Sequence, residues 1–282
     1  MRVALLGTGK MGAAIARRIA QDGHDLTLWN RTRERAEAVG VGRVADSPEA
    51  AADGAEIVLT IVFDAPAVRE LYARLRPAAG QVLVEMSTAG PGVLEDVAPA
   101  VEAAGASLLA CPIVGSVPAI EDGSAVLLAG GDAAALERAR GVLGSFGRPE
   151  HVGTRTEAAS LKLITNAMLG AVNVAAAELL SAADAAAVPK ESAFWLLCRL
   201  VPYLTVRRRG LLDHDHDNPL FELRGIRKDL DLMLQMGHDA GAALPVAGLA
   251  RELYGAAEPA WGGKEMTAVI ERYGAGLTAP ER

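Results

Sequence analysis

One lysine stands in a stretch that is otherwise almost entirely apolar. Between Glu157 and Glu178, Lys162 is the only charged residue, and Asn166 follows it four positions later. In a helix this spacing puts both side chains on one face. An ammonium at hydrogen-bond distance from a carbonyl stabilises the negative charge that grows on oxygen during reduction, and it can donate a proton there. The pair therefore has the chemistry of a general acid, Lys162, and a residue that orients it or the substrate, Asn166.

The same lysine has a simpler interpretation. Its stem could pack on apolar surface while the ammonium reaches water, and the helix alone favours this reading because a fully buried, unpaired lysine is rare. Gly170 and Asn173 continue the polar face of the helix. This stripe is typical of a cleft wall, and we expect Gly170 to leave room for a ligand against the backbone. The rest of the chain must decide between the two interpretations.

A glycine-rich motif near the N-terminus indicates a dinucleotide site. It follows the strand-like run 3–6 and opens the helical pattern 11–22, the context that the G-x-G-x-x-G fingerprint requires. Its first glycine allows a tight turn, its second lets the backbone approach a pyrophosphate, and its third permits close packing of helix on strand. The helix N-terminus adds amide donors for the phosphates. The predicted cofactor-binding residues here are Gly7, Thr8, Gly9, Lys10, Met11 and Gly12.

The end of the second predicted strand favours NADP(H) over NAD(H). An NAD site has Asp or Glu about 20 residues after the glycines, where it binds the ribose 2′-hydroxyl. This chain has Asn30, Arg31 and Thr32 there instead. The guanidinium of Arg31 suits a 2′-phosphate, and the other two side chains supply hydrogen-bonding groups. A surface arginine at a helix start is the simpler alternative.

The elements that must position these residues fall into two classes. In the first half, apolar runs alternate with helical patterns, which predicts βαβ units and a parallel sheet covered on both faces. The expected strands are 3–6, 26–29, 57–61, 82–85, 107–111 and 126–129, and the expected helices include 11–22, 65–75 and 92–104.

From residue 156 onward the pattern becomes entirely helical. One helix is expected over 156–188, ended by Pro189 and roughly 45–50 Å long at 1.5 Å per residue. Further helices are expected over 191–201, 226–240, 245–254 and 264–273. The predicted fold class is thus α/β, a Rossmann-type doubly wound sheet followed by a long interdomain helix and an all-α C-terminal domain. The predicted domains are 1–155, 156–188 and 189–282.

Composition excludes several other classes of protein. The chain has 282 residues, a net charge of −7 and only two cysteines, so a disulfide framework and a basic nucleic-acid surface are not expected. No secretory signal is visible, and polar residues interrupt the long apolar region, so we expect a cytoplasmic protein with no membrane span.

In order and spacing, these motifs resemble the β-hydroxyacid dehydrogenases, such as 3-hydroxyisobutyrate dehydrogenase and the glyoxylate/succinic semialdehyde reductases. The resemblance covers nearly the whole chain and includes Glu85-Met86-Ser87-Thr88, Gly153 to Asn166, Lys228-Asp229-Leu230 and 265–269. It implies an NADP(H) cofactor, a substrate cleft between domains, and a homodimer or homotetramer formed through the C-terminal helices. It also adds Val62, Phe63, Thr88 and Lys228 to the expected cofactor side and Ser87 to the substrate side.

The segment 110–116 departs from the family pattern. The family has D-A-P-V-S-G-G, whereas this chain has Ala-Cys-Pro-Ile-Val-Gly-Ser. The expected substrate-binding residues are Pro112, Val114, Gly115 and Ser116, with Lys162 and Asn166. Val114 cannot donate a hydrogen bond from its side chain, so the substrate, a small semialdehyde or keto acid by resemblance, could be bulkier or less polar.

Other candidate sites carry simpler interpretations. The run Asp213-His214-Asp215-His216-Asp217 cannot all converge on one ion and precedes a turn, so an exposed acidic loop is favoured and no metal is predicted. Cys111 is expected to be a packing residue. Two rival functions stay open, an imine reductase-like NADPH enzyme and a non-catalytic NADP-binding sensor or scaffold. A 6-phosphogluconate dehydrogenase would need a larger helical domain.

Overall fold

The structure is a computed structural model and describes residues 1–273. The chain forms two compact units, Met1–Lys162 and Leu163–Arg282. The division falls within one helix, directly after Lys162, so α8 (Arg155–Ala185) begins in the first unit and continues into the second.

The first unit is built on a parallel sheet. Its strands β1 (Arg2–Leu6), β2 (Asp25–Trp29), β4 (Ile57–Thr60), β5 (Val82–Glu85) and β6 (Ser107–Ala110) pair in parallel in the order β2-β1-β4-β5-β6, with β3 (Arg43–Val44) beside β2. This order reverses direction at β1, as in the doubly wound dinucleotide-binding folds. The strands β1, β4, β5 and β6 are almost wholly buried, which explains their unalternated apolar sequences, whereas β2 buries only Leu26 and Leu28.

The sheet continues through a mixed segment that the sequence predicted only in part. The strand β8 (Val126–Gly130) pairs antiparallel with β6 and β7 (Ile113–Val114), and parallel with β9 (Arg148–Gly153). The strands β3 and β7 are two residues long, and β9 contains exposed Arg, Glu and His. None of the three has the apolar run by which the other strands were predicted.

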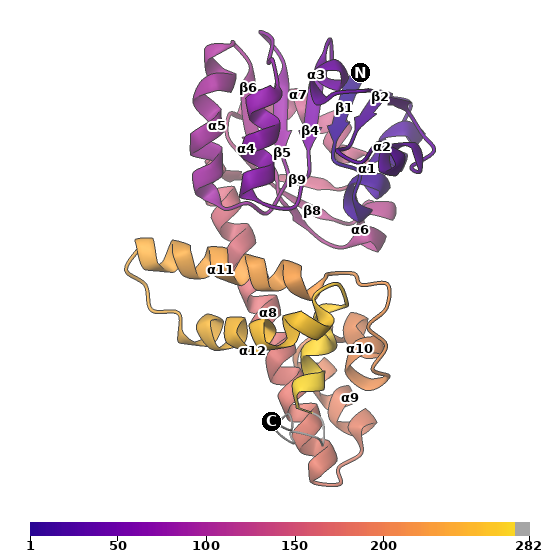
Figure 1. The fold of residues 1–282 in the computed structure, drawn as a ribbon, viewed down its shortest axis with the longest axis vertical. Helices are drawn as coiled ribbons and strands as arrows, with labels where there is room; N and C mark the ends of the chain where they lie inside the picture. The colour runs from indigo at the N-terminus through magenta and orange to yellow at the C-terminus, as the bar shows by residue number, and fades with distance from the viewer. Residues whose placement is uncertain (274–282) are drawn as a thin grey trace. The chain divides into compact units, whose positions relative to one another are not determined.

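Helices cover both faces of this sheet (Figure 1). One face packs against α1 (Lys10–Gln21), α6 (Val117–Glu121) and α7 (Ala133–Gly144), with Ile15, Ile120 and Leu136 in its core. The other packs against α3 (Pro48–Ala52), α4 (Ala65–Arg74) and α5 (Pro91–Ala103), with Val68 and Leu94. The short α2 (Arg33–Glu37) follows β2. Two apolar layers therefore hold the strand ends in fixed positions.

The second unit is helical throughout its described residues. After α8 come α9 (Lys190–Leu200), η1 (Pro202–Arg207), α10 (Arg208–Leu212), α11 (Leu223–Asp239), α12 (Pro245–Trp261) and η2 (Met266–Arg272). Their core includes Leu180, Leu230 and Tyr254. The predicted fold class is confirmed.

Two C-terminal helix predictions were wrong in their details. The helix α12 continues past Tyr254 to Trp261, and the expected helix 264–273 is the 3-10 helix η2. Glu265 bridges antiparallel to Glu222, which keeps its backbone extended, and its carboxylate accepts a hydrogen bond from the N–H of Met266. The helical turn can therefore begin only after Glu265.

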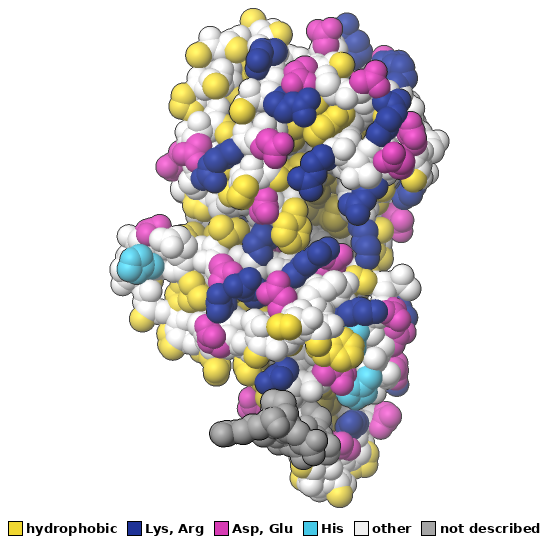
Figure 2. All heavy atoms as spheres, in the orientation of Figure 1, with side chains coloured by type: hydrophobic (Ala, Val, Ile, Leu, Met, Phe, Trp, Pro, Cys, Tyr) yellow, Lys and Arg dark blue, Asp and Glu magenta, His cyan; other side chains and the backbone are white. Residues whose placement is uncertain are grey.

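By length and composition, α8 could cross a membrane, although only by these criteria. Core helices of proteins that fold in water satisfy the same test, and 44% of its most apolar window is buried. On the face drawn in Figure 2, Lys and Arg side chains are interspersed with Asp and Glu. Neither observation tests the expected absence of membrane and nucleic-acid binding.

Candidate functional site

The turn between β1 and α1 is shaped for close approach of a ligand to the backbone. Gly7 has φ +108°, and a Cβ there would lie 2.0 Å from the carbonyl oxygen of Ile61. A Cβ at Gly12 would lie 2.0 Å from the carbonyl oxygen of Gly7. A Cβ at Gly9 would meet nothing within 4 Å. The first and third glycines are thus required by packing, whereas the second leaves an open approach, as the dinucleotide fingerprint predicts.

The N-terminus of α1 has the donors that such a ligand needs. Gly9 is the N-cap and supplies no side-chain acceptor for the first-turn N–H groups. Among the described residues, the buried hydroxyl of Thr8 has no hydrogen-bond partner. Unpaired helix N–H groups and the positive end of the helix dipole bind phosphates well. The residues present therefore fit a dinucleotide pyrophosphate.

Asn30 fixes this turn from the end of β2. Its Oδ1 accepts a hydrogen bond from the N–H of Thr8 at 3.0 Å, and its Nδ2 donates to the carbonyl oxygen of Thr32 at 2.9 Å. Arg31 and Thr32 are exposed. Arg33 is engaged within the fold by Glu37 and Asp46. The carboxamide of Asn30 thus joins the glycine turn after β1 to the turn after β2. The side chain of Arg31, in the turn after β2, is exposed.

A buried carboxyl group organises the ends of β4 and β5. Glu85 is 2% exposed, and burial raises its pKa, although hydrogen bonds from Ser87 and Thr60 act in the opposite direction. Its Oε1 accepts from the N–H of Ser87 at 2.7 Å, and its Oε2 accepts from the hydroxyl of Thr60. The hydroxyl of Ser87 in turn accepts from the N–H of Val62 at 2.8 Å.

Sequence reasoning missed this role of Glu85. Ser87, Thr88, Val62 and Phe63 were predicted as site residues, whereas Glu85 was noted only as part of a motif. The available signal was a carboxylate at the end of a strand that is otherwise apolar. Ser87 and Thr88 are partly buried, whereas the side chain of Phe63 is 52% exposed.

The divergent segment 110–116 is tied to β8 and α6. The carbonyl oxygen of Pro112 accepts from the N–H of Leu128, and Val114 pairs with Val126. Gly115 has φ +156°, which favours glycine, and Ser116 is the N-cap of α6. Burial raises the pKa of the Cys111 thiol to about 12, so the prediction of a packing residue fits its environment. Substrate binding by this segment stays a prediction.

In the second unit, Asn166 is held by a residue from the Lys-Asp-Leu motif. Asn166 Nδ2 donates to Asp229 Oδ2 at 2.6 Å, and both side chains are buried. The ammonium of Lys228 lies 2.7 Å from Asp229 Oδ1. Among the described residues, the buried Asn166 Oδ1 has no hydrogen-bond partner. Asp229 therefore fixes the carboxamide and leaves its oxygen available as an acceptor.

Along α8, the partly buried Lys162 precedes Asn166 by one turn. The part of the predicted polar stripe formed by Gly170 and Asn173 does not line a cleft, so the expectation of a cleft wall at these two residues was wrong. A Cβ at Gly170 would lie 3.3 Å from Leu230 and 3.4 Å from Ile226, so Gly170 serves close packing of α8 on α11. Asn173 donates to Tyr203 Oη at 3.2 Å. Both residues belong to the core of the second unit.

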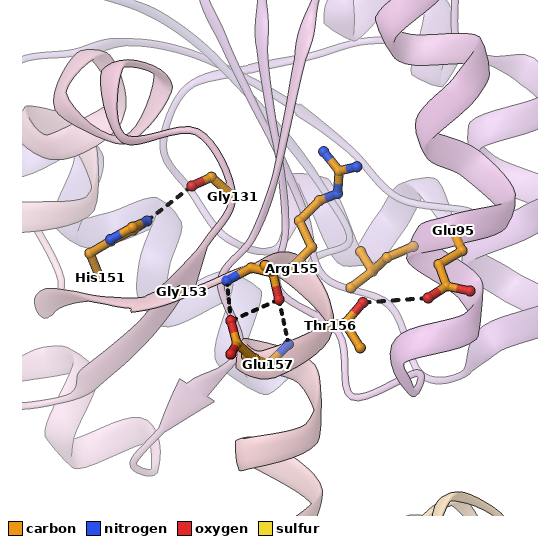
Figure 3. A pocket seen from close by; sticks show the side chains of 9 residues that line it. Glu95, Gly131, His151, Gly153, Arg155, Thr156 and Glu157 are labelled. Carbon is orange, nitrogen blue, oxygen red and sulfur yellow. Dashed lines mark hydrogen bonds between the residues drawn. The ribbon is translucent and has the colours of Figure 1, made fainter. Parts of the chain in front are cut away.

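A hollow of about 420 Å³ lies at the start of α8, and the predicted site residues do not line it (Figure 3). Glu157 accepts hydrogen bonds from the N–H and the hydroxyl of Thr154, and Thr154 Oγ1 accepts from the N–H of Glu157. Arg155 pairs with Glu102 at 2.8 Å. These groups satisfy each other as a helix cap, so the hollow is a structural feature of the α8 N-terminus.

Comparison with known families agrees with this arrangement. Residues 2–164 match the NAD binding domain of 6-phosphogluconate dehydrogenase, and residues 157–273 match the NAD-binding domain of NADP-dependent 3-hydroxyisobutyrate dehydrogenase. The two matches together cover the described chain from Arg2 onward. The chain belongs to the β-hydroxyacid dehydrogenase family.

Family members of known sequence differ in their named roles. The cytokine-like nuclear factor N-PAC of Danio rerio is 28% identical over 96% of this chain and 62% of its own length. An oxidoreductase described as uncharacterized, from Shewanella frigidimarina, is 27% identical over 90% of this chain and 91% of its own. This β-hydroxyacid dehydrogenase chain spans 43% to 62% of several N-PAC relatives, so whole-protein properties do not transfer from them.

Solved structures share the fold of this family member. Mycobacterium tuberculosis 3-hydroxyisobutyrate dehydrogenase, solved with L-serine, has a TM-score of 0.83 at 24% identity and covers 96% of this chain and 98% of its own. Psf3 in complex with NADP+ and 2-OPP has a TM-score of 0.85 at 21% identity, covering 96% and 99%. A reductive aminase from Aspergillus terreus, solved with NADPH4, has a TM-score of 0.62 at 22% identity, covering 96% and 99%.

Proposed function

We propose that this protein is an NADP(H)-dependent oxidoreductase that reduces a small semialdehyde or keto acid to the hydroxy acid, or catalyses the reverse reaction. Lys162 is the general acid in reduction and the base in oxidation. The observation that carries the proposal is the anchored carboxamide of Asn166, held by Asp229 one helical turn after Lys162. Among the described residues, Asn166 Oδ1 is buried without a hydrogen-bond partner, as Asn173 Oδ1 is, but Asn166 lies one turn from Lys162, where its oxygen can accept from the ammonium or from a substrate hydroxyl.

The chain's own residues would divide the work as follows. The α1 N-terminus and the glycine turn bind the dinucleotide phosphates, and the dinucleotide supplies or accepts the hydride. The ammonium of Lys162 donates a proton to the carbonyl oxygen as hydride reaches the carbonyl carbon. Asn166 Oδ1 accepts a hydrogen bond from the lysine or from the substrate hydroxyl, which orients the proton transfer.

NADP(H) is the preferred cofactor in this proposal. Its support is the exposed Arg31 at the end of β2, where NAD enzymes have a carboxylate. Asn30 is occupied within the turn by Thr8 and Thr32, so the phosphate-binding charge falls to Arg31. The substrate carries a carboxylate by family analogy, and Val114 makes its pocket less polar than the family pattern. We also propose a cytoplasmic location, with no membrane or nucleic-acid partner.

The test is a screen of NADPH oxidation with small semialdehydes, keto acids and cyclic imines, repeated with NADH. We expect turnover of a carboxylated carbonyl, with kcat/KM at least tenfold higher for NADPH than for NADH. Lys162→Ala should lower kcat by about 100-fold or more, because general acid catalysis contributes about 10² to 10⁴. NADPH binding, followed by fluorescence, should be retained.

Lys190→Ala is the matched control, since Lys190 is a lysine of the same unit as Asn166 and pairs with Asp184 at 3.2 Å on the surface. Its kcat should equal that of the wild type. Full activity in Lys162→Ala would refute the proposed role of that residue.

Two other functions are separated by the same screen. Turnover of cyclic imines without carbonyl reduction would favour an imine reductase, a function supported by the fold shared with the reductive aminase. NADPH binding without turnover of any carbonyl or imine would favour a sensor or scaffold. That alternative is supported by the N-PAC relatives and the altered segment 110–116.

A further inference from the structure

Three side chains of the second unit converge outside the residues discussed so far. His214 and His216 lie in the loop after α10, and Glu271 lies in η2. His214 Nδ1 is 2.6 Å and His216 Nε2 is 2.8 Å from the same oxygen, Glu271 Oε1. These three ligand atoms lie within 4.8 Å of one another. Residues more than 50 positions apart in sequence thus present two imidazole nitrogens and one carboxylate oxygen to one point.

The remaining acidic groups of the loop are directed elsewhere. Asp215 pairs with Arg209, and Asp217 pairs with Lys264. His216 is 4% exposed, which makes the expectation of a uniformly exposed acidic loop wrong for this residue. The five consecutive side chains do not all converge, as the sequence predicted, but alternate positions do. The two paired carboxylates lie against surface cations, His216 is buried, and His214 reaches the same Glu271 oxygen from an exposed position.

The buried histidine is supported on its other side. Thr267 Oγ1 lies 3.5 Å from His216 Nδ1, and the ring of Trp261 packs edge-on with its centroid 5.5 Å away. Gly210 leaves the space for this arrangement, since a Cβ there would lie 1.8 Å from Thr267 Oγ1. A hydroxyl partner on the second ring nitrogen is what orients a metal-binding histidine.

The cluster is open to solvent on one side, because the side chains of His214 and Glu271 are 42% and 27% exposed.

We propose that His214, His216 and Glu271 form a binding site for a divalent transition metal such as Zn²⁺, which joins the loop 213–217 to η2. Two histidines and a carboxylate are a recurrent zinc ligand set, with water in the fourth position. A tetrahedral Zn²⁺ site separates its ligand atoms by about 3.3 Å at bond lengths of about 2.0 Å. The distances from Glu271 Oε1 to His214 Nδ1 and His216 Nε2, 2.6 and 2.8 Å, would need to open by about 0.7 and 0.5 Å, and the two ring nitrogens, which lie within 4.8 Å of each other, would need to reach the same separation. The site lies within the second unit, where it would stabilise the packing of the loop 213–217 on η2. The proposal does not depend on the proposed reductase activity.

The test is calorimetric titration of Zn²⁺ into the full chain, from which any affinity tag has been removed and bound metal stripped with EDTA before dialysis. We expect one equivalent to bind with micromolar or tighter affinity. At a hundredfold excess over Kd, Zn²⁺ should raise the Tm by about 5 °C or more. Co²⁺ should quench Trp261 fluorescence, since that ring touches His216, and Trp261→Phe should remove most of the quenching.

Variants at the exposed ligands keep the test clear of folding defects. His214→Asn and Glu271→Gln should each weaken binding at least tenfold and abolish the rise in Tm. The matched controls are His238→Asn, an exposed histidine on α11, and Asp213→Asn, which removes one negative charge beside the cluster. Both should bind like the wild type. Absence of saturable binding in the wild type, or unchanged binding in both ligand variants, would overturn the proposal.

Discussion

Glu85 illustrates how one buried residue can set the geometry of a site it does not itself line. Its carboxyl group accepts hydrogen bonds from the N–H of Ser87 and the hydroxyl of Thr60. The hydroxyl of Ser87 in turn accepts a hydrogen bond from the N–H of Val62. These bonds join the ends of two neighbouring strands. The ends of parallel strands are where doubly wound folds bind ligands. Glu85 is therefore a positioning residue for the predicted residues Val62 and Ser87.

The raised pKa of Glu85 predicts a pH dependence of stability. Since burial raises this pKa above its unfolded value of 4.5, the protonated form is favoured by folding. The contribution to stability is complete below pH 4.5 and is lost as pH rises through the folded pKa. The unfolding free energy of the wild type minus that of Glu85→Gln should therefore fall as pH rises above 4.5, by at most about 1.4 kcal/mol per pH unit. Urea unfolding at several pH values measures it.

The control residue is Glu56, whose pKa is shifted in the opposite direction. The pKa of Glu56 is lowered, chiefly by a hydrogen bond from the backbone N–H of Arg2. A lowered pKa adds stability above the unfolded value and loses it as pH falls. The difference between wild type and Glu56→Gln should therefore stay constant above about pH 5 and fall only as pH drops below it. Parallel behaviour of the two variants would contradict the assignment for Glu85.

At the scale of elements, α8 and α11 are joined by a polar contact inside an apolar interface. Asn166 and Asp229 are buried, whereas Gly170 allows Leu230 and Ile226 to approach the α8 backbone. Unsatisfied polar groups are costly in such an interface, so their pairing also selects one register of α11 against α8. The Lys-Asp-Leu motif thus acts through its middle residue, Asp229, as well as through Lys228.

Asp229→Asn tests this coupling. The variant weakens the charge-assisted bond from Asn166 and the ion pair with Lys228, and it should lower the unfolding free energy by about 1–3 kcal/mol. If the proposed reductase activity holds, kcat should fall by about tenfold, while the Kd for NADPH changes less. Urea unfolding and steady-state kinetics measure both effects.

Asp231→Asn is the matched control, because Asp231 lies on the same helix and pairs with Arg251 at the partly exposed surface. Such surface pairs contribute at most about 1 kcal/mol. Equal effects of the two variants on kcat would show that the buried contact with Asn166 has no special role.

At the scale of the whole molecule, we propose that the chain is a homodimer or homotetramer. The helix α9 exposes Trp195, Leu196 and Leu200 at 65%, 55% and 74%. Large apolar side chains gathered on one short helix are typical of a surface that is covered by a partner. A second copy of the chain is the occupant expected from the family resemblance.

Light scattering after size exclusion should therefore give a mass of two or four times 29.2 kDa. The double variant Leu196→Glu and Leu200→Glu should shift the mass toward that of the monomer, because two carboxylates would be buried without partners. The control is Ala133→Glu with Ala134→Glu, which adds the same charge to exposed positions of α7. A monomeric wild type would refute the proposal.

The sequence by itself determined the class of fold and the position of the dinucleotide turn. Both depend on local information: β1, β4, β5 and β6 were visible because strands buried on both faces need continuous apolar runs, and β2 and β8, which are only partly buried, were visible as short segments rich in apolar residues. The three glycines were visible because turn, approach and packing each exclude a side chain at a fixed spacing. The long helix was equally clear from its uninterrupted pattern, although it ends at Ala185, three residues before the end predicted from Pro189.

Only the tertiary structure decided which distant residues meet. Asp229 reaches Asn166 across 63 positions, and Glu271 reaches the two histidines across more than 50. Gly170 proved to be a packing residue, because the space left by a missing side chain suits a ligand or a neighbouring helix, and only the tertiary structure shows which one fills it. Residue types state what chemistry is available, but burial and long-range hydrogen bonds, which no local pattern contains, determine which groups are brought together to use it.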